Sequence, residues 1–129
     1  MEEQTLSESE LLVMKTIWRS KEILSLQEIA ENVNAVYGKN WKSQTVSVFL
    51  GRIVKKKLLR SERSGRQFYY YPIITEEEYC QKETLKCVNV LGDGRADVFF
   101  SALSRARDLT DEERKRIRGI LDELDGSVD

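Results

Sequence analysis

The side chains best placed for chemistry in this sequence lie in the stretch from Trp41 to Lys57, which reads WKSQTVSVFLGRIVKKK. Apolar residues recur there at helical spacing, which predicts a helix over 43–57 that begins at a Ser43 cap. The opposite face carries a different set: Gln44, Thr45, Ser47, Val48, Gly51, Arg52, Lys55 and Lys56. The side chains in its first two turns are short or uncharged, and those at its end are positively charged. An ordinary solvated face carries charged side chains along its whole length.

This pattern suits the reading of DNA. A helix that enters a major groove needs small or hydrogen-bonding residues at its start, because its backbone must approach the base edges. Glutamine can bond adenine twice, threonine suits several bases, and a valine methyl can contact thymine. The base-reading residues that we expect are Gln44, Thr45, Ser47 and Val48. The expected contacts to the DNA backbone are Lys42, Ser43, Arg52, Lys55, Lys56, Arg63 and Arg66. The alternative is that all of them are ordinary surface residues.

The charge distribution also indicates a polyanionic partner. The 129 residues carry a formal net charge of −1, but residues 42–66 hold eight basic side chains against Glu62 alone. The net charge of that stretch is therefore +7, whereas residues 73–129 carry a net charge of −5. A local excess of this kind is the electrostatic footprint of a surface that binds nucleic acid.

The sequence lacks the residues and motifs that are typical of enzyme active sites. The sequence contains no histidine, which is the commonest general base and metal ligand. It also has no glycine-rich phosphate loop and no nucleophile motif, so we expect neither catalysis nor a metal or cofactor.

The two cysteines and the chain's polarity indicate a cytoplasmic protein. Cys80 and Cys87 stand seven residues apart, which allows neither a local disulfide nor a chelating pair, so we expect buried or half-buried thiols. No stretch approaches the ~18 consecutive apolar residues of a membrane span, so we expect no membrane insertion. The acidic start MEEQTLSESE predicts that no signal peptide is present.

Four capping boxes mark the expected helix starts. In each, a hydroxyl can accept a hydrogen bond from the first turn while a glutamate three residues later reaches back to the cap. The pairs are Ser7 with Glu10, Ser25 with Glu28, Thr75 with Glu78, and Thr110 with Glu113. With the apolar periodicity, they predict helices over 8–20, 26–37 and 76–91, one more after the glycine turn at 92–94, and a last one after Thr110.

A β-hairpin should follow the helix over 43–57. Residues 58–63 and the aromatic run 67–72 flank Ser64-Gly65-Arg66, and Pro72 should end the second strand. Three short helices followed by a hairpin with a basic tip is the order of a winged helix-turn-helix domain. The predicted fold is therefore mainly α with a small β-hairpin: a winged-helix DNA-binding domain over 1–74 and a helical dimerisation domain over 75–129.

The expected helical tail has more apolar surface than about 50 residues can bury alone. A symmetric partner tail would cover that surface, so we expect a homodimer. The expected interface residues are Val88, Leu91, Phe99, Phe100, Leu103, Ile117, Leu121 and Leu124. The alternative is that the tail folds back onto the first domain.

Several motifs together resemble the BlaI/MecI penicillinase-repressor family over nearly the whole chain. They are ELLVMKTIW at 10–18, WKSQTV at 41–46, RIVKK at 52–56, FYYYP at 68–72 and DLT at 108–110. The resemblance implies a homodimeric winged-helix repressor on a palindromic DNA operator. It also implies inactivation when the protease activity of a membrane sensor leads to cleavage in the dimerisation tail. By position, the groove-facing residues would be Gln44, Thr45 and Val48, with Arg52 near the DNA backbone.

The sequence departs from the family pattern at several positions. Lys57 stands where the family usually has the glycine that closes the third helix, and Val48 stands where the family often has threonine. The pair cleaved in the staphylococcal members aligns with Ala102 and Leu103. The C-terminus lacks the cysteines of the copper-responsive branch, so metal sensing of that kind is not expected. The remaining alternative is a winged-helix protein–protein interaction module without specific DNA binding.

Overall fold

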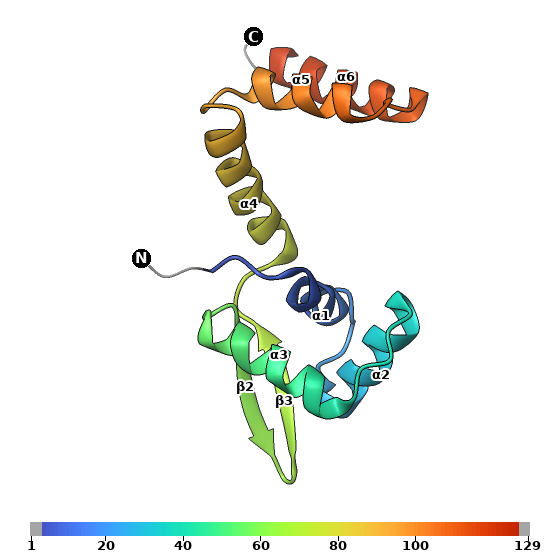
Figure 1. Ribbon diagram of the computed structural model, residues 1–129, viewed down its shortest axis with the longest axis vertical. Helices are drawn as coiled ribbons and strands as arrows, with labels where there is room; N and C mark the ends of the chain where they lie inside the picture. The colour runs from blue at the N-terminus through green and yellow to red at the C-terminus, as the bar shows by residue number, and fades with distance from the viewer. Residues whose placement is uncertain (1–3, 127–129) are drawn as a thin grey trace. The chain divides into compact units, whose positions relative to one another are not determined.

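A computed structural model describes residues 4–126, which form six helices and a three-stranded antiparallel sheet (Figure 1). The elements are α1 (Glu8–Trp18), β1 (Leu24–Ser25), α2 (Leu26–Tyr37), α3 (Ser43–Lys55), β2 (Leu59–Ser64), β3 (Gln67–Pro72), α4 (Glu76–Leu91), α5 (Ala96–Ala106) and α6 (Asp111–Gly126). The predicted fold class is confirmed: a winged-helix unit is followed by a helical tail. The outer ends of the two predicted domains, residues 1–3 and 127–129, lie outside the described residues.

All four predicted capping boxes are present. At α1, for example, the Ser7 hydroxyl accepts from the Glu10 amide at 3.2 Å, and the Glu10 carboxylate accepts from the Ser7 amide at 2.9 Å. The boxes that begin α2, α4 and α6 show the same reciprocal bonds. The predicted cap of α3 is wrong, because Lys42 is the N-cap residue and makes no side-chain cap bond. The hydroxyl of Ser43 donates instead to the Gln27 side chain at 3.0 Å.

Two helices end earlier than the sequence pattern predicts. The helix α1 ends at Trp18 rather than at residue 20, and α3 ends at Lys55 rather than at residue 57. At the end of α3, the Leu58 amide donates to the Ile53 carbonyl at 3.3 Å and the Lys57 amide donates to the Val54 carbonyl at 2.9 Å. These two bonds make a Schellman turn, and they place Lys57 in the left-handed region at a φ of +66°.

The sheet has the strand order β1-β3-β2. The predicted hairpin pairs Leu59 with Pro72 at one end and Ser64 with Gln67 at the other, and Gly65 turns the chain with a φ of +66°. The strand β1 was not predicted, because two residues are too short to show an alternating pattern. It pairs with β3 and leads directly into α2, so Ser25 serves both as strand residue and as helix cap.

The core of the first unit lies between α1, α2, α3 and the inner side of the sheet. Its fully buried side chains are Val13, Met14, Ile29, Val33, Val46, Leu50, Ile53 and Leu59. Asn34 closes the turn between α2 and α3, since its side chain donates to the Trp41 carbonyl at 2.9 Å and accepts from the Trp41 amide at 3.1 Å. These two hydrogen bonds and the buried side of α3 determine which face of α3 is exposed to solvent.

The chain separates into two compact units inside α4, Met1–Glu83 and Thr84–Asp129. The sequence pattern placed the division at 74/75, earlier than the structure does. The reason is Tyr79, which is only 6% exposed and packs its ring 5.7 Å from the ring of Trp18. The first two turns of α4 therefore belong with the winged-helix unit.

The second unit contains the rest of α4 together with α5 and α6. Gly92 joins α4 to α5 in a turn so tight that a Cβ there would lie 2.7 Å from the Arg95 carbonyl oxygen and 2.9 Å from that of Val88. At the α5–α6 turn, Arg107 makes a bidentate ion pair with Glu113, with distances of 2.9 and 2.7 Å. Glu113 also completes the capping box of Thr110.

Candidate nucleic-acid interface

The solvent face of α3 carries the predicted base-reading residues. Gln44, Thr45, Ser47 and Val48 are all exposed. They lie opposite a stripe in which Val46, Leu50 and Ile53 are fully buried. Val48 is 52% exposed, so an apolar side chain stands in water beside hydrogen-bonding ones. This face can offer both methyl and hydrogen-bonding contacts to the edges of bases.

Positive groups surround this face at both ends of α3. Lys42 precedes the helix, and Arg52 and Lys55 occupy its last turn; all three side chains are exposed. Basic residues in a last turn also stabilise a helix through its dipole, so their presence alone does not require DNA. The start of α3 is the more informative end, because it has no side-chain cap and its first amides can donate to a phosphate oxygen.

The hairpin adds two of the predicted arginines. Arg63 pairs in register with Phe68, and its guanidinium carbon lies 5.9 Å from the centre of that ring. Its Nε donates to the Gly65 carbonyl at 3.1 Å, so the side chain is held against the turn. Arg66 is exposed at the tip. Arg60, one more basic residue of β2, stacks on Tyr71 at 4.5 Å on the other side of the strand.

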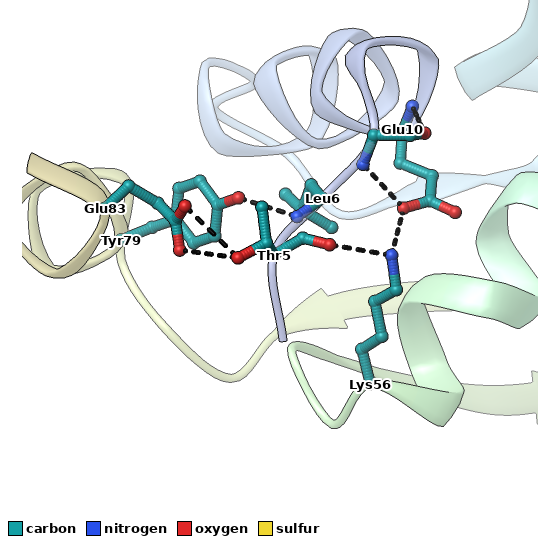
Figure 2. Close-up of polar contacts among 7 residues, drawn as sticks. Thr5, Leu6, Glu10, Lys56, Tyr79 and Glu83 are labelled. Atoms are coloured by element: carbon teal, nitrogen blue, oxygen red, sulfur yellow. Dashed lines mark hydrogen bonds and ion pairs between the residues drawn. The ribbon is translucent and has the colours of Figure 1, made fainter. Parts of the chain in front are cut away.

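Lys56 differs from the other predicted backbone contacts. Its ammonium donates to the Glu10 carboxylate at 2.6 Å and to the Thr5 carbonyl at 2.8 Å (Figure 2). Glu10 is only 2% exposed. Burial would raise the pKa of Glu10, but the hydrogen bonds from Lys56 and from the Ser7 amide outweigh it and hold that pKa below its ordinary value. The charge of Lys56 is therefore paired with the buried Glu10 carboxylate, and we do not place Lys56 in the interface.

The sequence contains one weak sign of this arrangement. Lys56 falls at the margin of the polar face of the helix, next to the buried side, whereas Arg52 and Lys55 do not. Its partner stands 46 positions away, however, and no local pattern connects the two.

The expectation for the cysteines was wrong. Both Cys80 and Cys87 are exposed on α4, because that helix buries only Tyr79. Within residues 4–126, no group of three or more potential ligand side chains could hold a metal ion. No helix in the same range is long and apolar enough to cross a membrane.

The predicted interface residues of the tail are open to solvent in the single chain. Leu91, Phe100, Leu103, Leu121 and Leu124 are exposed, and Val88, Phe99 and Ile117 are half-buried. Three further apolar side chains that were not among them are exposed as well: Leu85, Val90 and Ile120. Apolar surface of this extent usually marks a site of association.

Comparisons with known proteins show the family of this chain. The family model for the penicillinase repressor matches residues 6–123. The penicillinase repressor of Bacillus licheniformis is 28% identical over 118 residues, covering 92% of this chain and 90% of the relative. The methicillin resistance regulatory protein MecI of Staphylococcus aureus (strain N315) is 25% identical over 116 residues, covering 90% of this chain and 92% of that protein.

Among solved structures, the chain is similar to the monomeric form of Bacillus licheniformis BlaI in complex with the blaP half-operator, determined in solution. The two share 32% sequence identity with a TM-score of 0.48. The match covers 58% of this chain and 88% of that one.

Proposed function

The chain belongs to the penicillinase repressor family, and from this premise we propose that it acts as a cytoplasmic homodimer on a palindromic operator, with α3 reading the bases. It is a DNA-binding repressor and not an enzyme. The observation that carries the proposal is the solvent face of α3: short, uncharged and hydrogen-bonding at its start, positive at its end, and opposite a fully buried stripe.

In this proposal Gln44, Thr45, Ser47 and Val48 contact base edges. The DNA backbone is contacted by Lys42, Ser43, Arg52, Lys55, Arg63 and Arg66. The division of roles follows from the positions: side chains near the start of α3 are short enough to let the backbone approach the bases, whereas the long basic chains reach outward to phosphates.

The dimer would be held by the apolar side chains of α4, α5 and α6 in the second unit. One winged helix reads only part of an operator, and each half-site contributes little against the many competing sites of a genome. Joining two winged-helix units through the tail raises the effective concentration of the second unit at its half-site once the first unit is bound. The expected interface is therefore Val88, Leu91, Phe99, Phe100, Leu103, Ile117, Leu121 and Leu124.

Relief of repression would follow from a cut in α5, made by a protease linked to a membrane sensor. Ala102 and Leu103 are exposed in the single chain. A cut between them separates the apolar residues of α6 from those of α4, so each fragment keeps too little surface to hold the dimer. Two winged-helix units that are no longer joined bind with the weak affinity of single half-sites.

The proposal is tested by selecting bound sites from random DNA and titrating the full chain against the selected operator at several salt concentrations. We expect a palindromic site and an affinity that falls steeply with salt, because each neutralised phosphate contributes about −0.9 to the slope of log K against log salt. Selection of no common sequence, together with a flat salt dependence, would contradict the proposal and favour a protein–protein interaction module.

A further inference from the structure

Residues 4–7, which we call the clasp, lie between the end of α3 and the start of α4 (Figure 2). On the α3 side, the Thr5 carbonyl accepts from Lys56 at 2.8 Å. On the α4 side, the Thr5 hydroxyl donates to the two carboxylate oxygens of Glu83 at 3.3 and 3.2 Å. The Leu6 amide donates to the Tyr79 hydroxyl at 2.7 Å. Four residues therefore connect the reading helix to the helix that leads into the tail.

The clasp is anchored in the core. The Leu6 side chain is only 7% exposed and belongs to the same apolar cluster as the helices of the winged-helix unit. Buried hydrogen bonds are stronger than those at the surface, since water does not compete for them. The bond between the Leu6 amide and Tyr79 is of this buried kind.

The helix α4 has few other contacts with the winged-helix unit. Along Glu76–Leu91, Tyr79 is the one buried residue, so it is the one apolar anchor of the helix on the winged-helix unit. A helix held at one point can pivot about it. The bond from Thr5 to Glu83 adds a second point one turn further along, and beside it the Lys82 ammonium donates to the Gln4 side chain at 3.5 Å. The surface pair of Arg19 with Glu76, at 2.8 Å, adds a weaker contact at the helix start.

We propose that the clasp sets the direction in which α4 leaves the winged-helix unit, and thereby the half-site spacing that the operator must have. Thr5 and Tyr79 are then positioning residues, because they touch no DNA and act through α4. The inference rests on the proposed homodimer, whose two winged-helix units can meet only those half-sites whose separation matches their own. Lys56, at the end of α3, extends the same network to the reading helix.

The test uses the full chain with Thr5→Val, which removes the hydroxyl and keeps the shape of the side chain. Its matched partner, Thr5→Ser, keeps the hydroxyl and should behave as the parent. A second control, Thr84→Val, makes the same chemical change on an exposed position of α4 outside the clasp. A double variant, Thr5→Val with Tyr79→Phe, removes the bonds from Thr5 to Glu83 and from Leu6 to Tyr79, while the Tyr79 ring remains against Trp18 and the 3.5 Å contact from Lys82 to Gln4 is left in place.

Affinities are measured for operators whose half-sites are moved apart or together by one and two base pairs, and for a single half-site. The parent should prefer one spacing. Thr5→Val should weaken that preference about fivefold, because one net hydrogen bond commonly shifts an equilibrium by that factor, and the double variant should weaken it further. Binding to the single half-site should be unchanged in every variant. Amide hydrogen exchange at residues 79–83 should become faster in the double variant, because the clasp no longer holds α4. The same exchange should be unchanged in Thr84→Val.

The outcomes separate the two claims. If the parent gains nothing from a second half-site, both the homodimer and this inference are wrong. If the parent prefers one spacing and the two clasp variants keep that preference in full, the homodimer stands and the clasp does not set the spacing. If Thr5→Ser loses the preference as Thr5→Val does, the hydroxyl is not the cause and the inference is also wrong.

Discussion

Replacing Lys56 by methionine should destabilise the protein without altering its contact with DNA. Lys56 lies in a run of three lysines at the end of α3, and its sequence neighbours are exposed. Its own ammonium, however, neutralises the buried carboxylate of Glu10 at 2.6 Å. Methionine preserves the length and packing of the side chain but leaves that carboxylate without its cation.

The magnitude follows from the burial of the two partners. Removing one member of a buried ion pair costs about 3–5 kcal/mol. The Lys56 side chain is 24% exposed while that of Glu10 is 3% exposed, so water reaches one partner only. Solvent screening reduces the loss to about 2–3 kcal/mol. For a unit of this size, the loss corresponds to a fall in Tm of roughly 10–20 °C.

Thermal unfolding followed by circular dichroism measures the first part of this prediction, and binding at several salt concentrations measures the second. The matched control is Lys55→Met, one residue earlier and exposed. That variant should change the stability by less than about 0.5 kcal/mol. It should make the salt slope shallower by about 0.9 for each winged-helix unit on DNA. Adding Glu10→Gln to Lys56→Met should recover part of the stability, because no buried charge is then left unpaired.

An unchanged Tm for Lys56→Met, with a shallower salt slope, would refute this reasoning. Lys56 would then contact phosphate, as its place in the basic run of the sequence suggests, and the ion pair would have little weight in the folded protein.

Other predictions address the interface, the tail and its pH dependence. Gln44→Ala should lower the preference for one base pair of the operator by about 1–3 kcal/mol and leave binding to random DNA unchanged; equal losses on both DNAs would exclude a reading role. A chain that ends at Glu83 should remain folded and run as a monomer in sedimentation, whereas the full chain should run as a dimer at micromolar concentration; a full-length monomer would contradict the dimer. Gly92→Ala should destabilise the tail by about 1–3 kcal/mol because of the 2.7 Å approach to the Arg95 carbonyl, as measured by the dimer's dissociation; wild-type dissociation would show that the turn relaxes freely. The hydrogen bonds from Arg107 and from the Thr110 amide lower the pKa of Glu113 from 4.5 to about 2. Its contribution to stability is therefore complete above pH 4.5 and lost as the pH falls toward 2, and an acid titration of Glu113→Gln should lack that part of the transition.

Local signals in the sequence were enough to predict most helices. A capping box needs only residues three positions apart, so Ser7 with Glu10 and Thr110 with Glu113 could be recognised from the order of residues alone. The solvent face of α3 could be predicted for the same reason, because helical periodicity by itself separates Val46 and Leu50 from Gln44.

The features that escaped prediction depend on contacts between distant parts of the chain. Glu10 and Lys56 are 46 positions apart, and Leu6 and Tyr79 are 73 apart. Tyr79 also packs against Trp18, and these contacts keep the first turns of α4 with the winged-helix unit. The cysteines were expected to be buried or half-buried because their spacing allows neither a local disulfide nor a chelating pair, but spacing does not say how much of α4 the single chain covers.

At the end of α3, the residue Lys57 has two opposing effects: its backbone conformation costs stability, and its charge attracts DNA. A side chain other than glycine in the left-handed region costs roughly 1–2 kcal/mol. Glycine would relieve that strain, but it would also remove an exposed positive charge two residues after Lys55. Long-range attraction to the phosphates of DNA speeds the approach of a protein before any contact forms. We therefore propose that Lys57 lowers the stability of the fold and in return speeds the approach of the repressor to DNA.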